Sequence, residues 1–461
     1  MSVLIRNALA INTGLAGDAM RWDVTALGGD IRVEGPLITA MGRLQPTTGE
    51  RVIDASGCVV MPGWINTHHH LFQSLLKGIP EGLDAPLMGW LSAVPVRWRR
   101  GFDQEATLRL AARVGLIELL LAGCTTVADH QYHVWPDMPW DASAAVFDEA
   151  ERLGLRLVLA RGGQTIARAV DTRPSPQVQP ETFDQFCTAL ARDAARFHDP
   201  APDAMRRVAC APSTPTWSVK PEELQPLARH ARALGLRLHS HLSETVDYVR
   251  YCREVHGCTP MQFVERHEWV GPDVWYAHMV HLSPEEIALC AATGTGIAHC
   301  PQSNGRLGSG IAPISAALAA GVPVGLAVDG AASNEAADLL AEAHAAWLLQ
   351  RAAQGAGAFS VADVLRIGTA GGARVLGLDA VGTLAPGQAA DLVLYELDEA
   401  RHLGLHDPGV APIVCGRARA RDVWVAGRRV LRNGAIPGLD LSALRAEVAQ
   451  AVTDLKAAVL G

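Results

Sequence analysis

Four side chains that end apolar segments of the sequence have the types needed to bind one metal ion. His68 and His70 end the first such segment, and His241 and Asp329 end two later ones. Because alternate side chains of an extended strand share a face, His68 and His70 point the same way while His69 points away. Three imidazoles and one carboxylate suit zinc or ferrous iron and leave a position open for water. The set therefore predicts a metal-dependent hydrolase.

Size, charge and cysteine content limit the possible classes of protein. The chain has 461 residues, 49% of them hydrophobic, which is enough for one large barrel and a smaller companion domain. A formal net charge of −8 without any basic run argues against a nucleic-acid partner. The nine cysteines are scattered and form no C-x-x-C pair, which favours reduced thiols in a cytoplasm.

Neither of two segments checked for export or membrane insertion fits such a role. Residues Met1 to Gly14 lack the basic, apolar and small-residue pattern of an export signal. The most apolar stretch, Ile314 to Val328, contains Gly321 and Pro323. We therefore expect it to be a helix end followed by a buried strand, and we expect no membrane span.

Short β-rich runs alternate with helical patterns between Pro62 and about Gly355, which is typical of βα units around a parallel sheet. Eight such runs are enough to close a barrel, and residues at the carboxyl ends of its strands would meet at one face. The strands are expected at Val59–His68, Thr125–His130, Arg156–Gly162, Val208–Ser213, Arg237–Glu244, Trp275–Val280, Thr295–Cys300 and Pro323–Gly330. Helices are expected at Gln104–Leu121, Ala142–Leu153, Pro180–Phe197, Pro221–Leu234 and Asn334–Gln350.

The two flanks of the chain contain short alternating segments, and neither looks able to bury a core alone. We expect residues 1–61 and 373–440 to pair into one β-sandwich domain beside a (β/α)8 barrel of residues 62–372. An amphipathic helix is expected in residues 441–461.

Several motifs resemble those of the amidohydrolase superfamily, over nearly the whole length of the chain. The segment Pro62–His70 (PGWINTHHH) matches its first metal motif, and Ser240–Glu244 (SHLSE) matches the motif with the third ligand and an acid. Ala277–His278, His299–Asn304 (HCPQSN) and Val328–Asn334 (VDGAASN) match three more. The closest resemblance is to the aminohydrolase branch, which contains guanine, cytosine and adenosine-analogue deaminases.

This resemblance implies a metal-dependent deaminase, most similar to those of oxo-pterin rings such as isoxanthopterin. The reaction would replace an exocyclic amino group by oxygen and release ammonia. 8-Oxoguanine or guanine is the alternative substrate. One divalent ion, zinc or iron, would be bound by His68, His70, His241 and Asp329. The resemblance also suggests a homo-oligomer.

The catalytic roles follow from what hydrolytic deamination requires, namely an activated water and protonation of the ring nitrogen and the leaving amine. Asp329 can bind the ion through one oxygen and hydrogen-bond the water through the other, taking the water's proton as attack begins. Glu244 would move the proton to the ring, and His278 would hydrogen-bond the developing tetrahedral oxygen. His281 is an alternative to His278, and His239 shares the strand face of His241 and is a rival ligand.

Candidates for substrate binding lie near the same strand ends. Gln73 offers a donor and an acceptor to an amide edge of a ring, and Arg161 could hold an oxo group, unless it forms a salt bridge inside the scaffold. His130, Tyr132 and Trp90 could stack on a flat ring, although core packing is an equal alternative for the last two. The segment from Gly78 to Arg100 is a candidate lid.

Two other designs of metal hydrolase do not fit the sequence. Lysine occurs only at positions 77, 220 and 456, so the bridging lysine of two-metal amidohydrolases is missing from the fourth strand and a single ion is expected. The H-x-E and P-C-x-x-C pair of cytidine-type deaminases is also absent.

Two rival functions remain open. A triazine chloro- or aminohydrolase could use the same ligands, although Glu244 favours amine release. A catalytically silent scaffold should have lost ligands, and this chain retains all of them.

Overall fold

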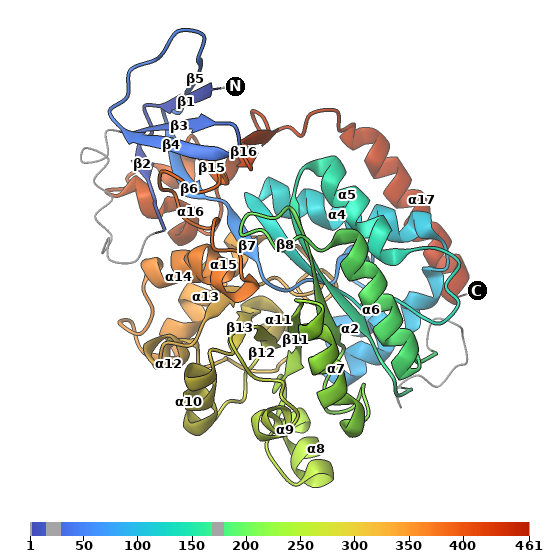
Figure 1. Ribbon diagram of the computed structural model, residues 1–461. Helices are drawn as coiled ribbons and strands as arrows, with labels where there is room; N and C mark the ends of the chain where they lie inside the picture. The colour runs from blue at the N-terminus through green and yellow to red at the C-terminus, as the bar shows by residue number, and fades with distance from the viewer. Residues whose placement is uncertain (1, 15–28, 168–178, 461) are drawn as a thin grey trace.

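The computed structural model describes residues 2–14, 29–167 and 179–460, and its centre is a barrel of eight parallel strands (Figure 1). The strands follow one another around the barrel in chain order. The first and last strands approach each other, since Thr67 N–H donates to Leu326 O at 3.0 Å and Asp329 N–H to His68 O at 3.2 Å. The predicted (β/α)8 fold is confirmed. The strands are β7 (Trp64–Asn66), β8 (Cys124–Gln131), β9 (Arg156–Gly163), β10 (Arg206–Pro212), β11 (Arg237–Leu242), β12 (Val274–His278), β13 (Gly296–His299) and β14 (Val324–Leu326).

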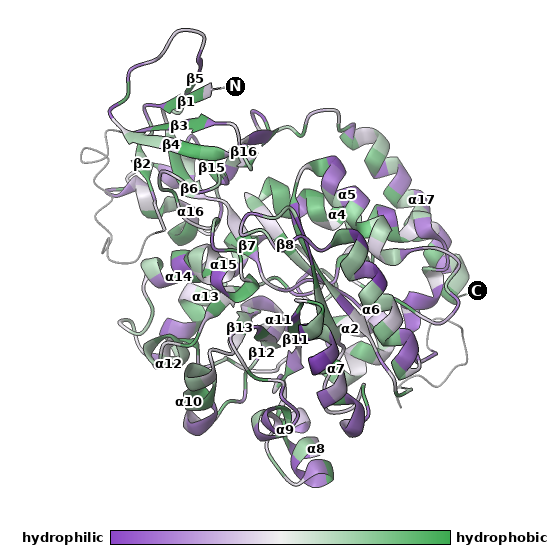
Figure 2. Ribbon diagram, viewed as in Figure 1, coloured by the Kyte–Doolittle hydropathy of each residue, from purple (hydrophilic) through white to green (hydrophobic). Residues whose placement is uncertain are grey.

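Helices surround the barrel, and hydrophilic and hydrophobic residues alternate along them, as expected of helices with one face on the barrel (Figure 2). Side chains fix several helix starts. Thr182 and Ser283, for example, each form a capping box. The main helices are α4 (Glu105–Leu121), α5 (Ala142–Leu153), α6 (Phe183–Phe197), α7 (Pro221–Ala233), α8 (Val246–His256), α9 (Pro260–Arg266), α10 (Pro284–Thr293), α11 (Pro301–Arg306), α12 (Ile314–Ala319), α13 (Leu339–Gln354), α14 (Val361–Gly368) and α15 (Ala370–Leu376).

Alternation along each strand separates two buried regions. Small residues such as Ala128, Ala160, Ala211 and Ala298 form one cluster with Trp275, and they come from β8, β9, β10, β13 and β12. Because these strands all contribute to it, this cluster fills the inside of the barrel. The residues between them on each strand belong to the larger core shared with the helices.

Strands from both ends of the chain form two further sheets beside the barrel (Figure 1). A shared apolar cluster, which includes Ile5, Ile31, Val60, Leu392 and Trp424, joins the two sheets. The four-stranded sheet contains β1 (Ser2–Arg6), β3 (Asp30–Glu34), β4 (Leu37–Gly42) and β5 (Arg51–Asp54). The five-stranded sheet contains β2 (Ala10–Ile11), β6 (Cys58–Pro62), β15 (Leu392–Glu396), β16 (Arg419–Val425) and β17 (Arg428–Leu431). The domain boundaries 1–61, 62–372 and 373–440 remain our proposal.

The prediction of one strand from Val59 to His68 is wrong, because the chain changes its partner at Gly63. The strand before it, β6, pairs antiparallel with β15, whereas β7 pairs parallel with β8. Gly63 N–H donates to Asp391 O at 3.0 Å, and the next residue, Trp64, donates to Gly123 O at 3.1 Å. One apolar run therefore serves two sheets.

Buried polar contacts fasten the small sheets to the barrel. Arg156 of β9 forms a fully buried ion pair with Asp391. Trp64 Nε1 donates to the hydroxyl of Tyr395 at 2.8 Å, and this hydroxyl donates to Ala122 O at 2.6 Å. These contacts lie at the end of the barrel where the strands begin. They therefore hold the sheets to the barrel and leave the face at the carboxyl ends of the strands free.

The predicted C-terminal helix is present as α17 (Leu441–Leu460), and it contacts the short helix η3 (Arg99–Gly101). Within the part of the chain that the structure describes, no helix is long and apolar enough to cross a membrane. The nine cysteines are all free.

Gly63→Ala tests the change of partner between the two sheets. A Cβ atom there would lie 2.2 Å from Cγ2 of Thr125, so the variant should lose about 1–3 kcal/mol of stability and melt at a lower temperature. Gly357→Ala, whose Cβ would meet nothing within 4 Å, is the matched control. Equal melting temperatures of the two variants would contradict this account.

Candidate active site

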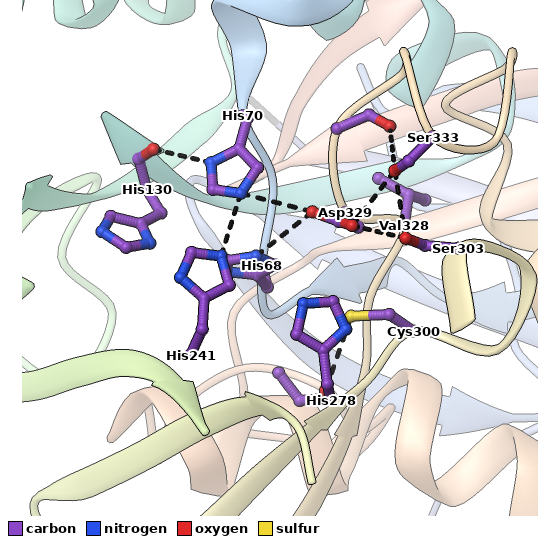
Figure 3. Close-up of polar contacts among 12 residues, drawn as sticks. His68, His70, His130, His241, His278, Cys300, Ser303, Val328, Asp329 and Ser333 are labelled. Atoms are coloured by element: carbon purple, nitrogen blue, oxygen red, sulfur yellow. Dashed lines mark hydrogen bonds and ion pairs between the residues drawn. The ribbon is translucent and has the colours of Figure 1, made fainter. Parts of the chain in front are cut away.

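Five of the six side chains predicted to carry the chemistry come together where the barrel strands end (Figure 3), and the sixth, Glu244, lies 3.7 Å from His278. Parallel strands deliver their carboxyl ends to one face of a barrel, which explains how such distant residues meet. His68 and His70 follow β7, His241 lies in β11 with Glu244 just beyond it, His278 ends β12, and Asp329 follows β14.

Hydrogen bonds to backbone oxygens fix which ring nitrogen of His70 and of His241 carries the proton. His70 Nδ1 lies 2.9 Å from His130 O, and His241 Nδ1 lies 2.6 Å from Ser213 O. Because a carbonyl oxygen only accepts, each Nδ1 must donate its proton. In the neutral rings each Nε2 is therefore left with a bare lone pair.

His68 reaches the same state through His239. Nδ1 of His239 donates to Trp275 O at 3.0 Å, so its Nε2 can only accept, and it lies 2.8 Å from His68 Nδ1. The ring of His239 also stacks on Trp275, with centroids 4.4 Å apart. His239 therefore orients His68, and both of its own nitrogens are engaged, which argues against its being the rival ligand.

The three bare nitrogens face one another and a carboxylate. His70 Nε2 lies 3.1 Å from His241 Nε2, and Asp329 Oδ1 lies 3.4 Å and 3.3 Å from Nε2 of His68 and His70. Burial lowers the pKa of His68 and of His241 well below the ordinary value, so these rings are neutral. Lone pairs that converge without protons between them suit a cation.

Two overlapping groups of side chains have the spacing of a metal site. One contains His68, His70, His130 and His241, and the other contains His68, His241, His278 and Asp329. The donor set of nitrogen and carboxylate oxygen atoms fits a divalent transition metal such as zinc.

The second carboxylate oxygen of Asp329 does not face this cluster. Ser303 Oγ donates to Oδ2 at 2.5 Å, and Ser333 Oγ lies 3.1 Å from the same atom (Figure 3). This differs from our expectation that one oxygen binds the ion while the other meets the water. Oδ1 is the oxygen that faces the imidazoles of His68 and His70.

Glu244 and His278 face each other beside the imidazole cluster. Glu244 Oε2 lies 3.7 Å from His278 Nε2, and His278 Nδ1 donates to Asn304 Oδ1 at 2.8 Å. Burial raises the pKa of Glu244 above the ordinary value. His281 instead contacts Ser309 O at 2.9 Å and does not line the cavity. His278 is therefore the better placed of the two histidines.

A cavity that opens to solvent lies over these groups. It contains three of the predicted substrate-binding residues, Gln73, Trp90 and Tyr132, together with several that we did not predict. Its walls are His70, Gln73, Leu87, Trp90, Leu91, Tyr132, Ser213, Thr214, Trp217, His241, Glu244, Tyr248, His278, Leu307 and Asp329.

The candidate lid contributes one wall of this cavity. Leu87, Trp90 and Leu91 belong to the short helix α3 (Leu87–Leu91), and Trp90 Nε1 donates to Ala332 O at 3.0 Å. That hydrogen bond ties the insertion to the loop that follows β14.

Trp217 is a wall residue that the sequence analysis missed. Its ring lies 4.4 Å from that of Tyr248, centroid to centroid. The only signal in the sequence was an aromatic residue shortly after the fourth strand.

Arg161 lies outside the cavity, contrary to its prediction as a substrate-binding residue. Its neighbour Ala160 faces the barrel interior, so alternation turns Arg161 outward, where its Cζ atom lies 4.7 Å from the ring centroid of Phe186. Its two terminal nitrogens donate to the carboxylate of Glu181 at 2.7 Å and 2.5 Å. The alternative reading, a salt bridge within the scaffold, is the one the structure supports.

His130 also does not line the cavity. It faces the barrel interior beside the imidazoles, 4.9 Å from the ring of His241, and its Nε2 donates to Ala211 O at 2.8 Å. Its backbone oxygen orients His70. The structure therefore places it as a support of the cluster rather than as a substrate contact.

Comparison with known proteins agrees with this geometry. The family model described as "Amidohydrolase family" matches residues 59–430. The chain belongs to the amidohydrolase family. It is 52% identical to an isoxanthopterin deaminase from an unknown prokaryotic organism, covering 98% of this chain and 97% of that protein. It is 39% identical to an 8-oxoguanine deaminase of Pseudomonas aeruginosa, covering 95% and 96%.

Solved structures of the same family are similar over the whole chain. An amidohydrolase from an environmental sample of the Sargasso Sea is 47% identical, with a TM-score of 0.88 and full coverage of both chains. An atrazine chlorohydrolase of Arthrobacter aurescens complexed with zinc is 31% identical, with a TM-score of 0.89, covering 98% of this chain and 100% of that one.

His239→Phe tests the orientation of His68. Phenylalanine keeps the stack on Trp275 but removes the acceptor of the His68 proton, so zinc affinity should fall about 10–100-fold in competition with a chelator. His402→Phe, in the short helix η5 (Ala400–His402) outside the barrel, is the control and should bind zinc as the wild type does. Unchanged zinc affinity in His239→Phe would show that His239 does not orient His68 for metal binding.

Proposed function

We propose that the protein is a metal-dependent deaminase that hydrolyses the exocyclic C–N bond of an oxo-pterin ring and releases ammonia. The observation that carries the proposal is the buried pair of Glu244 and His278, which faces the imidazole cluster across one cavity. A proton-carrying carboxyl group beside a metal site is what release of an amine requires. The 52% identity to an isoxanthopterin deaminase supports this ring as the substrate.

We assign one divalent ion to His68, His70, His241 and Asp329, with zinc as the ion. The converging Nε2 atoms and Asp329 Oδ1 support this set, and the zinc-containing relative supports the metal. When bound, such an ion makes water acidic enough to act as a nucleophile near neutral pH. Iron accepts the same ligands, and metal analysis of the purified protein distinguishes the two.

Glu244 is the group that moves protons in this proposal. Its carboxyl group would take a proton as water attacks the ring carbon and deliver it to the adjacent ring nitrogen. It would then transfer the second proton of that water to the departing amine, which leaves as ammonia. Asp329 is less suited to this task, because two serine hydroxyls hold its Oδ2.

His278 would stabilise the oxygen that develops on the ring carbon. Its Nδ1 donates to Asn304 Oδ1, so Nε2 is the atom that faces the cavity, and it would donate to that oxygen when it carries a second proton.

Gln73, Trp90 and Tyr132 are the residues that we propose to hold the ring. Gln73 Nε2 donates to the hydroxyl of Tyr132 at 3.0 Å, which fixes the carboxamide in the cavity wall, where it can read an amide edge. Trp90 and Tyr132 offer aromatic surface to a flat bicycle. Arg161 and His130 have no part in this proposal.

A triazine ring is the second candidate substrate. The similarity to an atrazine chlorohydrolase favours it, because that enzyme shares the fold over nearly the whole chain. Glu244 argues against chloride as the leaving group, since chloride does not need to be protonated. The retained ligands argue against a silent scaffold. A cytoplasmic location and a homo-oligomer remain predictions.

A substrate panel tests the proposed function. Ammonia release should be fastest from isoxanthopterin, followed by 8-oxoguanine, then guanine, pterin and cytosine. Removal of the metal with a chelator should abolish release, and added zinc should restore it. A chlorotriazine that reacted faster than every amino heterocycle would refute the ring assignment.

Glu244→Gln tests the proton transfer. The variant should contain as much metal as the wild type but turn over at least about 100-fold more slowly, because the amide cannot carry the proton. Glu254→Gln, an exposed position on α8, is the control and should be fully active. Activity of Glu244→Gln near that of the wild type would remove Glu244 from the mechanism.

A further inference from the structure

The carboxamide of Gln73 lies against a glycine of the loop that follows β14. Gln73 belongs to the short helix η1 (Leu71–Leu75), which directly follows His70, and only 1% of the residue is exposed. Its Nε2 donates to the hydroxyl of Tyr132, whereas its Oε1 has no hydrogen-bond partner among the residues described. The head of this side chain is therefore held by packing on one side and by one hydrogen bond on the other.

Gly330 provides the space that this head fills. A Cβ atom at Gly330 would lie 1.8 Å from Oε1 of Gln73, 2.4 Å from its Cδ and 3.0 Å from its Nε2. Contacts that short do not occur, so a side chain at this position displaces the carboxamide.

The backbone of Gly330 does not itself require glycine. Its φ angle lies outside the left-handed region, unlike that of its neighbour Asp329, whose φ is 62°. An L-residue could adopt the same conformation, and the three nearest atoms that its Cβ would meet all belong to the head of Gln73. The glycine is therefore explained by its contact with Gln73, a residue that lines the cavity, and not by its own backbone conformation.

We propose that Gly330 is a specificity-determining position, which keeps Gln73 flat against the cavity wall and so sets the width available to the ring. This inference rests on the proposed function, since it assumes that Gln73 reads a bicyclic substrate. Any side chain at 330 would push the carboxamide away from the loop, toward Tyr132 and the cavity. The cavity would then be narrower, and the donor and acceptor atoms would be misplaced.

A double-mutant cycle on activity tests the proposal. Gly330→Ala should lower kcat/KM for isoxanthopterin at least tenfold, and should lower it by a smaller factor for 8-oxoguanine, whose fused five-membered ring is narrower. In a Gln73→Ala background the same change should cost less than threefold, because the obstructing head is gone. Gly357→Ala is the control and should match the wild type.

Equal losses for the two rings, or equal losses in the two Gln73 backgrounds, would overturn the proposal. Two readouts do not depend on turnover. Fluorescence titration of isoxanthopterin into the Glu244→Gln protein should give a Kd at least tenfold higher once Gly330→Ala is added. Melting temperature should fall on Gly330→Ala only when Gln73 is present.

These readouts also separate the two hypotheses. Ammonia release from neither ring by the wild type would refute the proposed function, while the melting cycle would still decide whether Gly330 and Gln73 are coupled. A melting cycle without coupling would refute the inference alone.

Discussion

The site depends on three hydrogen bonds that hold the protons of three imidazoles away from its centre. Backbone oxygens accept from Nδ1 of His70 and His241, and His239 accepts from Nδ1 of His68. Each ring is thereby fixed in one tautomer and one orientation before any ion arrives. Burial keeps His68 and His241 neutral, since it lowers their pKa. The protein thus supports a cluster of lone pairs that would repel one another without a cation, and the rigid barrel is what makes such an arrangement possible.

The backbone at this face is strained at and beside residues that line the cavity. Ser243, His278, Met279 and Asp329 all have positive φ angles between 50° and 72°. Each such residue costs on the order of 1–3 kcal/mol and persists only where its surroundings fix it. For Asp329 the restraint is visible, because its N–H donates to His68 O at 3.2 Å and the hydroxyls of Ser303 and Ser333 contact its carboxylate. The same hydrogen bond therefore helps to close the barrel and places Asp329 beside the histidines.

The local sequence pattern is enough to predict the parts of the site that follow from strand alternation. It fails where contacts with residues distant in the sequence determine the structure. Alternation placed His68 and His70 on one face. The same rule, applied with Ala160 facing the barrel interior, predicts that Arg161 faces away from it. Arg161 was nevertheless predicted to bind substrate, because it is a basic residue at a strand end. The run from Val59 to His68 gave no sign of its break, since Gly63 is explained only by contacts with Thr125 and Asp391. Trp217, in a loop after β10, became a candidate only when the cavity was seen.

The arrangement around Asp329 bears on how proton transfer is divided. A carboxylate oxygen has two lone-pair directions, and both Ser303 and Ser333 approach Oδ2. Oδ1 lies within 3.4 Å of the bare Nε2 atoms of His68 and His70, so it is the oxygen placed to bind the ion in our proposal. Burial raises the pKa of Glu244, so its carboxyl group binds a proton more readily than an ordinary glutamate does. These contacts support the proposed division of roles, in which Asp329 binds the ion and Glu244, rather than Asp329, receives the proton of the attacking water.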